Sequence, residues 1–153
     1  MKHLLVIFGG QSGKTRQLCE AVCAGAVAEA QDEVELRCLP AASAGLDDLL
    51  WAQGLLIGTP ENFGYMAGIV KDFFDRTFYP AQDRVKGLPY AIFISAGNDG
   101  SGAARAIERI AIGYGFKPVA EPLIVKGEVT EAALTRCREL GAAMAAGLAA
   151  GVF

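Results

Sequence analysis

Five short apolar runs, most of them followed by a stretch of helical periodicity, are the feature that most limits how this chain can fold. The runs are "LLVIF" (4–8), "VELRCL" (34–39), "GLLIG" (54–58), "YAIFIS" (90–95) and "PLIV" (122–125). Helices are predicted over 15–30, 47–52, 69–78, 102–114 and 130–150. Strict alternation of strand and helix predicts a parallel sheet with helices on both faces. The 153 residues fit one α/β domain covering 1–153.

The composition of the runs predicts where each strand lies in the sheet. Four runs are continuously apolar, which is typical of strands covered on both faces. The run 34–39 instead alternates Val34, Leu36 and Cys38 with Glu35 and Arg37, which predicts an edge strand. The aromatic stripe in 69–78 is expected to be core, and Thr130 is expected to cap the last helix.

Three glycine-rich or polar segments follow the first, third and fourth runs. They cover 9–13, 59–68 and 96–101. In a doubly wound sheet of order 2-1-3-4-5, ligands bind outside the carboxyl ends of the strands, where the strand order reverses between strands 1 and 3. We therefore expect the three segments to form one composite site.

The first segment, within "VIFGGQSGKT" (6–15), ends like a nucleotide-triphosphate loop but is one residue too short. The motif requires glycine at position 8, which is Phe8, and no run ends in an aspartate that could hold magnesium. A single terminal phosphate fits better, because a helix start offers unpaired N–H groups. Ser12 and Thr15 add hydroxyls and Lys14 adds charge. The alternative is a plain turn that Thr15 caps.

Charge and cysteine usage exclude several other functions. A net charge of −3 without a basic cluster argues against nucleic acid, and no apolar run reaches the roughly 20 residues of a membrane span. No signal peptide is visible, so a cytoplasmic protein is expected. Cys19, Cys23, Cys38 and Cys137 contain no Cys-x-x-Cys pair, and His3 is the only histidine. We therefore expect buried thiols in a reducing compartment, and neither a metal site nor a catalytic acid or base.

The stretch "GTPENFGYMAGIVKDFFDRTFYP" (58–80) resembles the flavin-binding segment of flavodoxin-like NAD(P)H-dependent FMN and quinone reductases. The resemblance rests on Gly-Thr-Pro, Phe-Gly, Met-Ala-Gly and Lys-x-Phe-x-Asp-Arg, and on "SAGNDGSG" (95–102) preceded by Lys-Gly-x-Pro. It implies a flavodoxin-like three-layer sandwich around a five-stranded parallel sheet. It also implies FMN as cofactor, NAD(P)H as co-substrate, and a small electron acceptor such as a quinone.

The resemblance also implies which residues hold FMN. Around the phosphate it places Gly10, Gln11, Ser12, Gly13, Lys14 and Thr15; along the ring Thr59, Pro60, Glu61, Asn62, Phe63, Gly64 and Tyr65; and on the other side Ser95, Ala96, Gly97, Asn98 and Gly100. Gly10 stands where the family often has Ser or Thr. Phe63 and Tyr65 are expected to form an apolar platform, the alternative for Phe63 being a core plug. The Glu61 carboxylate is expected to face solvent.

Two other functions stay open. One is a flavodoxin-type electron carrier, although such carriers tend to be more acidic than this chain. The other is a flavin-free binding protein that kept the fold. The alanine-rich stretch "LGAAMAAGLAAG" (140–151) could form an oligomer contact or pack within the chain.

Overall fold

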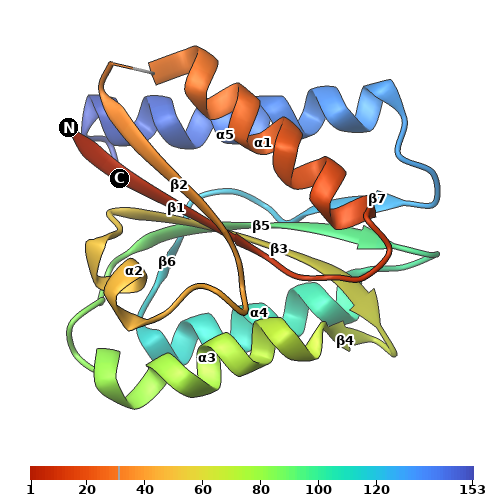
Figure 1. The fold of residues 1–153 in the computed structure, drawn as a ribbon, viewed down its shortest axis with the longest axis horizontal. Coiled ribbons are helices and arrows are strands. Elements are labelled where there is room, and N and C mark those ends of the chain that lie inside the picture. The colour runs from red at the N-terminus through yellow and green to blue at the C-terminus, as the bar shows by residue number, and fades with distance from the viewer. Residues whose placement is uncertain (31) are drawn as a thin grey trace.

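The computed structural model describes residues 1–30 and 32–153, which fold around one parallel sheet (Figure 1). Its strands are β1 (Lys2–Phe8), β2 (Val34–Pro40), β3 (Gly54–Asn62) and β5 (Pro89–Ala96), in the order β2-β1-β3-β5. The position beyond β5 is shared by β6 (Lys117–Pro118), which pairs with its beginning, and β7 (Leu123–Lys126), which pairs with its end. The predicted order is therefore confirmed, with the fifth strand divided into two pieces.

Helices cover both faces of the sheet, as predicted. In Figure 1, α1 (Lys14–Ala30) and α5 (Glu131–Ala150) lie on one face, and α3 (Gly68–Ala81) and α4 (Ser101–Tyr114) lie on the other. The short α2 (Leu46–Trp51) packs beside α3. Thr130 caps α5, its hydroxyl accepting the N–H of Ala133 at 3.1 Å. Among the described residues, no helix is both long enough and apolar enough to cross a bilayer.

The edge position of β2 is confirmed, and it has a consequence for one cysteine. β2 pairs only with β1 among the described strands, with Cys38 opposite Val6. Cys19 and Cys137 are buried, as expected, but Cys38 is exposed. The expectation that all the thiols are buried is therefore wrong for Cys38, because an edge strand is covered less completely than an inner one, and Cys23 is only partly buried.

The small residues of α5 are used for packing within the chain. A side chain at Gly141 would overlap the backbone carbonyl of Val22 in α1, and one at Gly25 in α1 would overlap that of Arg138 in α5. The two helices can approach this closely only because both positions lack a Cβ. The alanine-rich stretch thus serves the intramolecular contact that was one of its two predicted uses.

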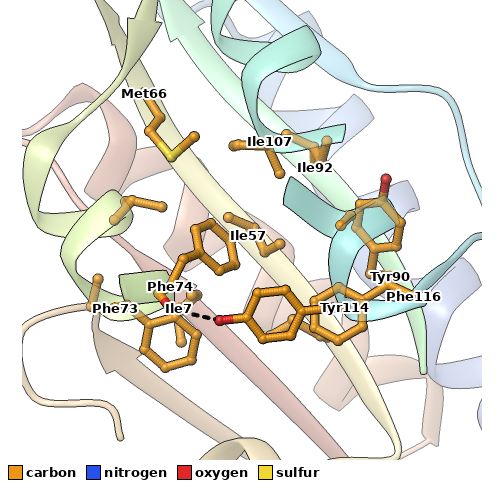
Figure 2. Close-up of a cluster of buried hydrophobic side chains, with 14 of the residues drawn as sticks. Ile7, Ile57, Met66, Phe73, Phe74, Tyr90, Ile92, Ile107, Tyr114 and Phe116 are labelled. Atoms are coloured by element: carbon orange, nitrogen blue, oxygen red, sulfur yellow. Dashed lines mark hydrogen bonds between the residues drawn. The ribbon is translucent and has the colours of Figure 1, made fainter. Parts of the chain in front are cut away.

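The aromatic stripe of α3 lies in the core, as expected. Figure 2 shows Phe73 and Phe74 packed with Tyr114 of α4 against the sheet. The Tyr114 hydroxyl donates to the carbonyl of Phe74 at 2.7 Å and lies 2.8 Å from Thr77 Oγ1. Burial raises the pKa of Tyr114 to about 12. This phenol therefore ties α4 to α3 beneath the sheet.

Candidate functional site

The three predicted segments meet at the carboxyl ends of β1, β3 and β5, on the right of Figure 1. Because parallel strands end at the same edge, the loop 9–13, the chain after Gly58 and the loop 97–100 come together there. The N–H of Gly9 donates to the carbonyl of Gly58 at 3.0 Å, which joins the first two. The three predicted segments therefore lie together at one edge of the sheet, and we call this edge the rim.

The glycine loop of the rim, residues 9–13, has backbone conformations that residues with a side chain rarely adopt. Gly10 has φ +134° and Gly13 has φ +87°. A Cβ at Gly10 would lie 3.2 Å from both Pro60 Cδ and Thr15 Oγ1, so the loop is pressed against β3. Because α1 begins at Lys14, its first N–H groups have no acceptor within the helix. This loop can therefore bind an anion such as a terminal phosphate.

Several predicted site residues support the rim from below. Thr15 and Ser95 are buried, and their hydroxyls are 2.9 Å apart, which ties the first loop to the third. Thr59 is fully buried, accepting the N–H of Ala67 and donating to the carbonyl of Pro60, both at 2.9 Å. Lys14 donates to the carbonyl of Gly127 at 3.2 Å, in the turn after β7. These side chains fix the loops to one another.

The segment expected as a long loop over 59–68 is mostly a hairpin, which corrects the sequence prediction. β3 continues to Asn62, and β4 (Tyr65–Met66) pairs back onto it. The connecting residues Phe63 and Gly64 have φ +52° and +73°. Positive φ at both central residues is typical of a two-residue hairpin turn. The Phe63 side chain is fully exposed and that of Tyr65 is 41% exposed. The core-plug alternative for Phe63 is therefore wrong.

Glu61 caps α4 and does not face solvent freely, contrary to expectation. Its carboxylate accepts the N–H groups of Gly100 at 2.9 Å, Gly102 at 3.0 Å and Ala103 at 3.1 Å. The N-cap residue, Gly100, has no side chain to do so. A Cβ at Gly102 would overlap the carbonyl of Gly64, so the hairpin tip rests on the helix start. A helix start without a capping side chain was the available signal for this contact.

The third loop leaves the rim open. The Asp99 carboxylate accepts the hydroxyl of Ser101 at 2.9 Å, and its bonds to Ser101 hold the pKa of Asp99 below its usual range. Gly97 and Asn98 are exposed, whereas Ala96 and Gly100 are buried. A Cβ at Gly13, Gly64 or Gly97 would meet no atom of the described residues within 4 Å. Three loops thus border open space, with the glycine loop at the start of α1 on one side and the exposed residues Phe63 and Tyr65 on another. That arrangement fits FMN.

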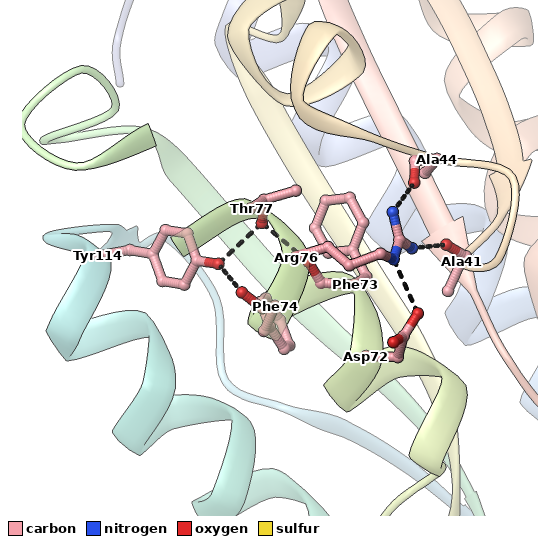
Figure 3. A network of polar contacts seen from close by, with 8 residues as sticks. All are labelled: Ala41, Ala44, Asp72, Phe73, Phe74, Arg76, Thr77 and Tyr114. Carbon is pink, nitrogen blue, oxygen red and sulfur yellow. Dashed lines mark hydrogen bonds and ion pairs between the residues drawn. The ribbon is translucent and has the colours of Figure 1, made fainter. Parts of the chain in front are cut away.

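A cavity of about 210 Å³ extends the rim toward β2. Gly10, Gln11 and Asn62 line it together with the chain after β2 and the start of α3. Figure 3 shows how Arg76 holds this wall: its guanidinium donates to the carbonyls of Ala41 at 3.0 Å and Ala44 at 2.9 Å. Arg76, a residue of the quoted motif, therefore shapes the cavity without lining it.

Comparison with known proteins agrees with this geometry. The model of the NADPH-dependent FMN reductase family matches residues 3–122. A flavodoxin of Aquifex aeolicus is 32% identical over 119 residues, covering 76% of this chain and 63% of that protein. An NAD(P)H dehydrogenase (quinone) of Acidithiobacillus ferrooxidans is 29% identical over 121 residues, covering 67% and 60%. The chain thus spans about three fifths of the length of these two relatives.

Solved structures show the same fold. An archaeal flavodoxin superposes with a TM-score of 0.81 at 22% identity, over 95% of this chain and 98% of that one. A WrbA-like flavodoxin from Agrobacterium tumefaciens gives 0.79 at 20% identity, over 99% of both. The fold is therefore flavodoxin-like, and the chain belongs to the NADPH-dependent FMN reductase family.

Proposed function

We propose that the chain binds FMN at the rim and oxidises NAD(P)H, passing the electrons to a small acceptor of the quinone type. The single observation that carries the proposal is the β3–β4 hairpin. It exposes Phe63 in a left-handed conformation and is held by Glu61 against α4, beside a glycine loop suited to a phosphate. A flat aromatic ring with one phosphate tail matches both ends of that arrangement.

Each part of the rim has a separate task in this proposal. The N–H groups at the start of α1 bind the phosphate, and the Thr15–Ser95 contact keeps that loop in register with the third one. Phe63 and Tyr65 pack on the ring, and the backbone of the hairpin turn offers polar groups to its edge. FMN, when bound, supplies the hydride chemistry, while the chain provides binding, orientation and electrostatics.

The test is an anaerobic titration of the FMN-loaded protein with NADPH and, separately, NADH. We expect loss of the oxidised flavin spectrum with one of them, and recovery when a quinone is added. A protein that takes up FMN and keeps an oxidised spectrum with both would refute the reductase proposal. A protein that takes up no added FMN would refute the flavin site itself.

A flavodoxin-type electron carrier is the second candidate, favoured by the 32% identity to the Aquifex aeolicus flavodoxin. A carrier would take electrons from a protein partner and show no reduction by NAD(P)H. The modest net charge of −3 offers less electrostatic steering toward such a partner, so we place the reductase first.

A further inference from the structure

Three cysteines that lie apart in the sequence bring their sulfur atoms together, away from the rim residues described above. Cys19 and Cys23 are four residues apart on α1, so both project from the same side of the helix. Cys38 comes from the edge strand β2 beneath it. Cys19 Sγ lies 3.1 Å from Cys38 Sγ and 4.0 Å from Cys23 Sγ, and all three sulfurs lie within 4.8 Å of one another.

We propose that Cys19, Cys23 and Cys38 form a binding site for one thiophilic d10 cation, Zn²⁺ or Cu⁺, held by three sulfur ligands. Thiolates are the ligands that these ions prefer over oxygen donors. This site is independent of the flavin proposal, because none of its three residues belongs to the rim.

The spacing of the sulfurs suits such an ion. With Zn–S bonds of about 2.3 Å in tetrahedral geometry, ligand sulfurs lie about 3.8 Å apart. The observed separations of 3.1 and 4.0 Å lie on either side of that value, and the third separation is within 4.8 Å, so the three sulfurs are close enough together for one ion to bridge them after side-chain rotation. A disulfide between Cys19 and Cys38 would use two of the three sulfurs and give the third no role, which is why we favour the cation.

Burial and charge also fit. Cys19 is buried, Cys23 is partly covered and Cys38 is exposed, so an ion has an entry path from the β2 edge and a position open to water. A divalent ion with three thiolates carries a net charge of −1. Arg16, one turn before Cys19 on α1, acts electrostatically on Cys38 and offsets that charge.

The sequence alone did not point to this site because it lacks the usual spacing. Zinc sites are commonly recognised by Cys-x-x-Cys pairs and a fourth ligand. Here a helical i,i+4 pair is completed by a strand residue that only the β1–β2 register brings into place.

The test uses the full chain, reduced and free of metal, under anaerobic conditions. One arm adds Zn²⁺ against a chromophoric zinc chelator, and a second adds Cu⁺ against a copper(I) chelator, so that the two ions are told apart. Addition of Cd²⁺ reports sulfur ligation through its thiolate charge-transfer absorption. We expect one ion per chain, proton release on binding, and protection from a thiol reagent of Cys23 and Cys38, the two cysteines of the cluster that are not buried in the metal-free chain.

Variants locate the ion. Cys23→Ser and Cys38→Ser should each weaken binding on the order of 100-fold or more. Cys137→Ser is the matched control, since Cys137 lies in α5 outside the cluster, and it should bind as the parent does. If Cys23→Ser does not fold, thiol protection in the parent chain decides alone. Absence of stoichiometric binding in the reduced parent, or equal binding by Cys38→Ser and Cys137→Ser, would overturn the proposal.

Discussion

Glu61→Gln tests whether the hairpin is held in place by the start of α4. In the native chain, Oε1 accepts one N–H, from Gly100, and Oε2 accepts two, from Gly102 and Ala103. Glutamine offers a single acceptor, and its amide group would face an N–H donor. The substitution therefore removes at least one bond and the charge assistance of the others.

The magnitude follows from those contacts. A hydrogen bond to a charged group contributes about 1.5–3 kcal/mol, and a charge at a helix start about 0.3–1 kcal/mol. Glu61 is partly exposed, so we take the lower part of the combined range, about 2–3 kcal/mol of unfolding free energy. For a chain of 153 residues this lowers Tm by about 4–12 °C. Because the released hairpin must be ordered again on binding, the Kd for FMN should rise at least about tenfold.

Thermal unfolding and fluorescence titration of FMN measure the two effects. Glu139→Gln is the matched control, because it removes the same charge from an exposed position on α5. If both variants melt at the same temperature and bind FMN equally, Glu61 does not hold the hairpin and the reasoning fails.

Three further outcomes are expected. Phe63→Gly should raise the unfolding free energy measured in urea by roughly 0.5–1 kcal/mol, because glycine adopts the φ of +52° without strain. The same substitution should weaken FMN binding, and tighter binding would refute the role of Phe63 as a platform for the ring. Gly141→Ala should lower the unfolding free energy by about 1–3 kcal/mol, because its methyl group meets the carbonyl of Val22, and an unchanged urea midpoint would contradict this packing. Tyr114 has a folded pKa of about 12 against an ordinary value of 10.0, so its stabilisation is complete below pH 10 and is lost as pH rises through 12. Between these two pH values the unfolding free energy of the parent chain should fall by roughly 2–3 kcal/mol. The fall should be smaller in Tyr114→Phe, and comparing the urea midpoints of the parent and the variant across this pH range measures the difference.

The sheet could be predicted because its strands and helices follow local patterns. The runs in β1, β3 and β5 are apolar without interruption, and the stripe in α3 repeats at helical spacing, so periodicity fixed their type and order. The alternation in β2 likewise placed it at the edge. These elements agree with what each short segment prefers by itself.

Contacts between distant segments could not be predicted in the same way. Glu61 reaches N–H groups 39 to 42 residues further along the chain, and the thiols of Cys19 and Cys38 meet across 19 residues. Neither contact leaves a periodic pattern, because each depends on how the strands are ordered. The N-cap without a side chain at Gly100 is a local signal for the first of them.

Phe63 is the residue where local preference and the fold disagree most. A two-residue turn of this kind favours Asn-Gly, and a left-handed phenylalanine costs on the order of 1 kcal/mol or more. Its ring is also fully exposed, so it gains no burial in the free chain. Nothing in the packing of the described residues offsets either cost. A flat aromatic ligand packed on that ring would bury it, and the Glu61 contact would keep the turn in position for that ligand. We therefore propose that this strained turn serves binding rather than folding, with the hairpin tip as the ring-binding end of the proposed FMN site.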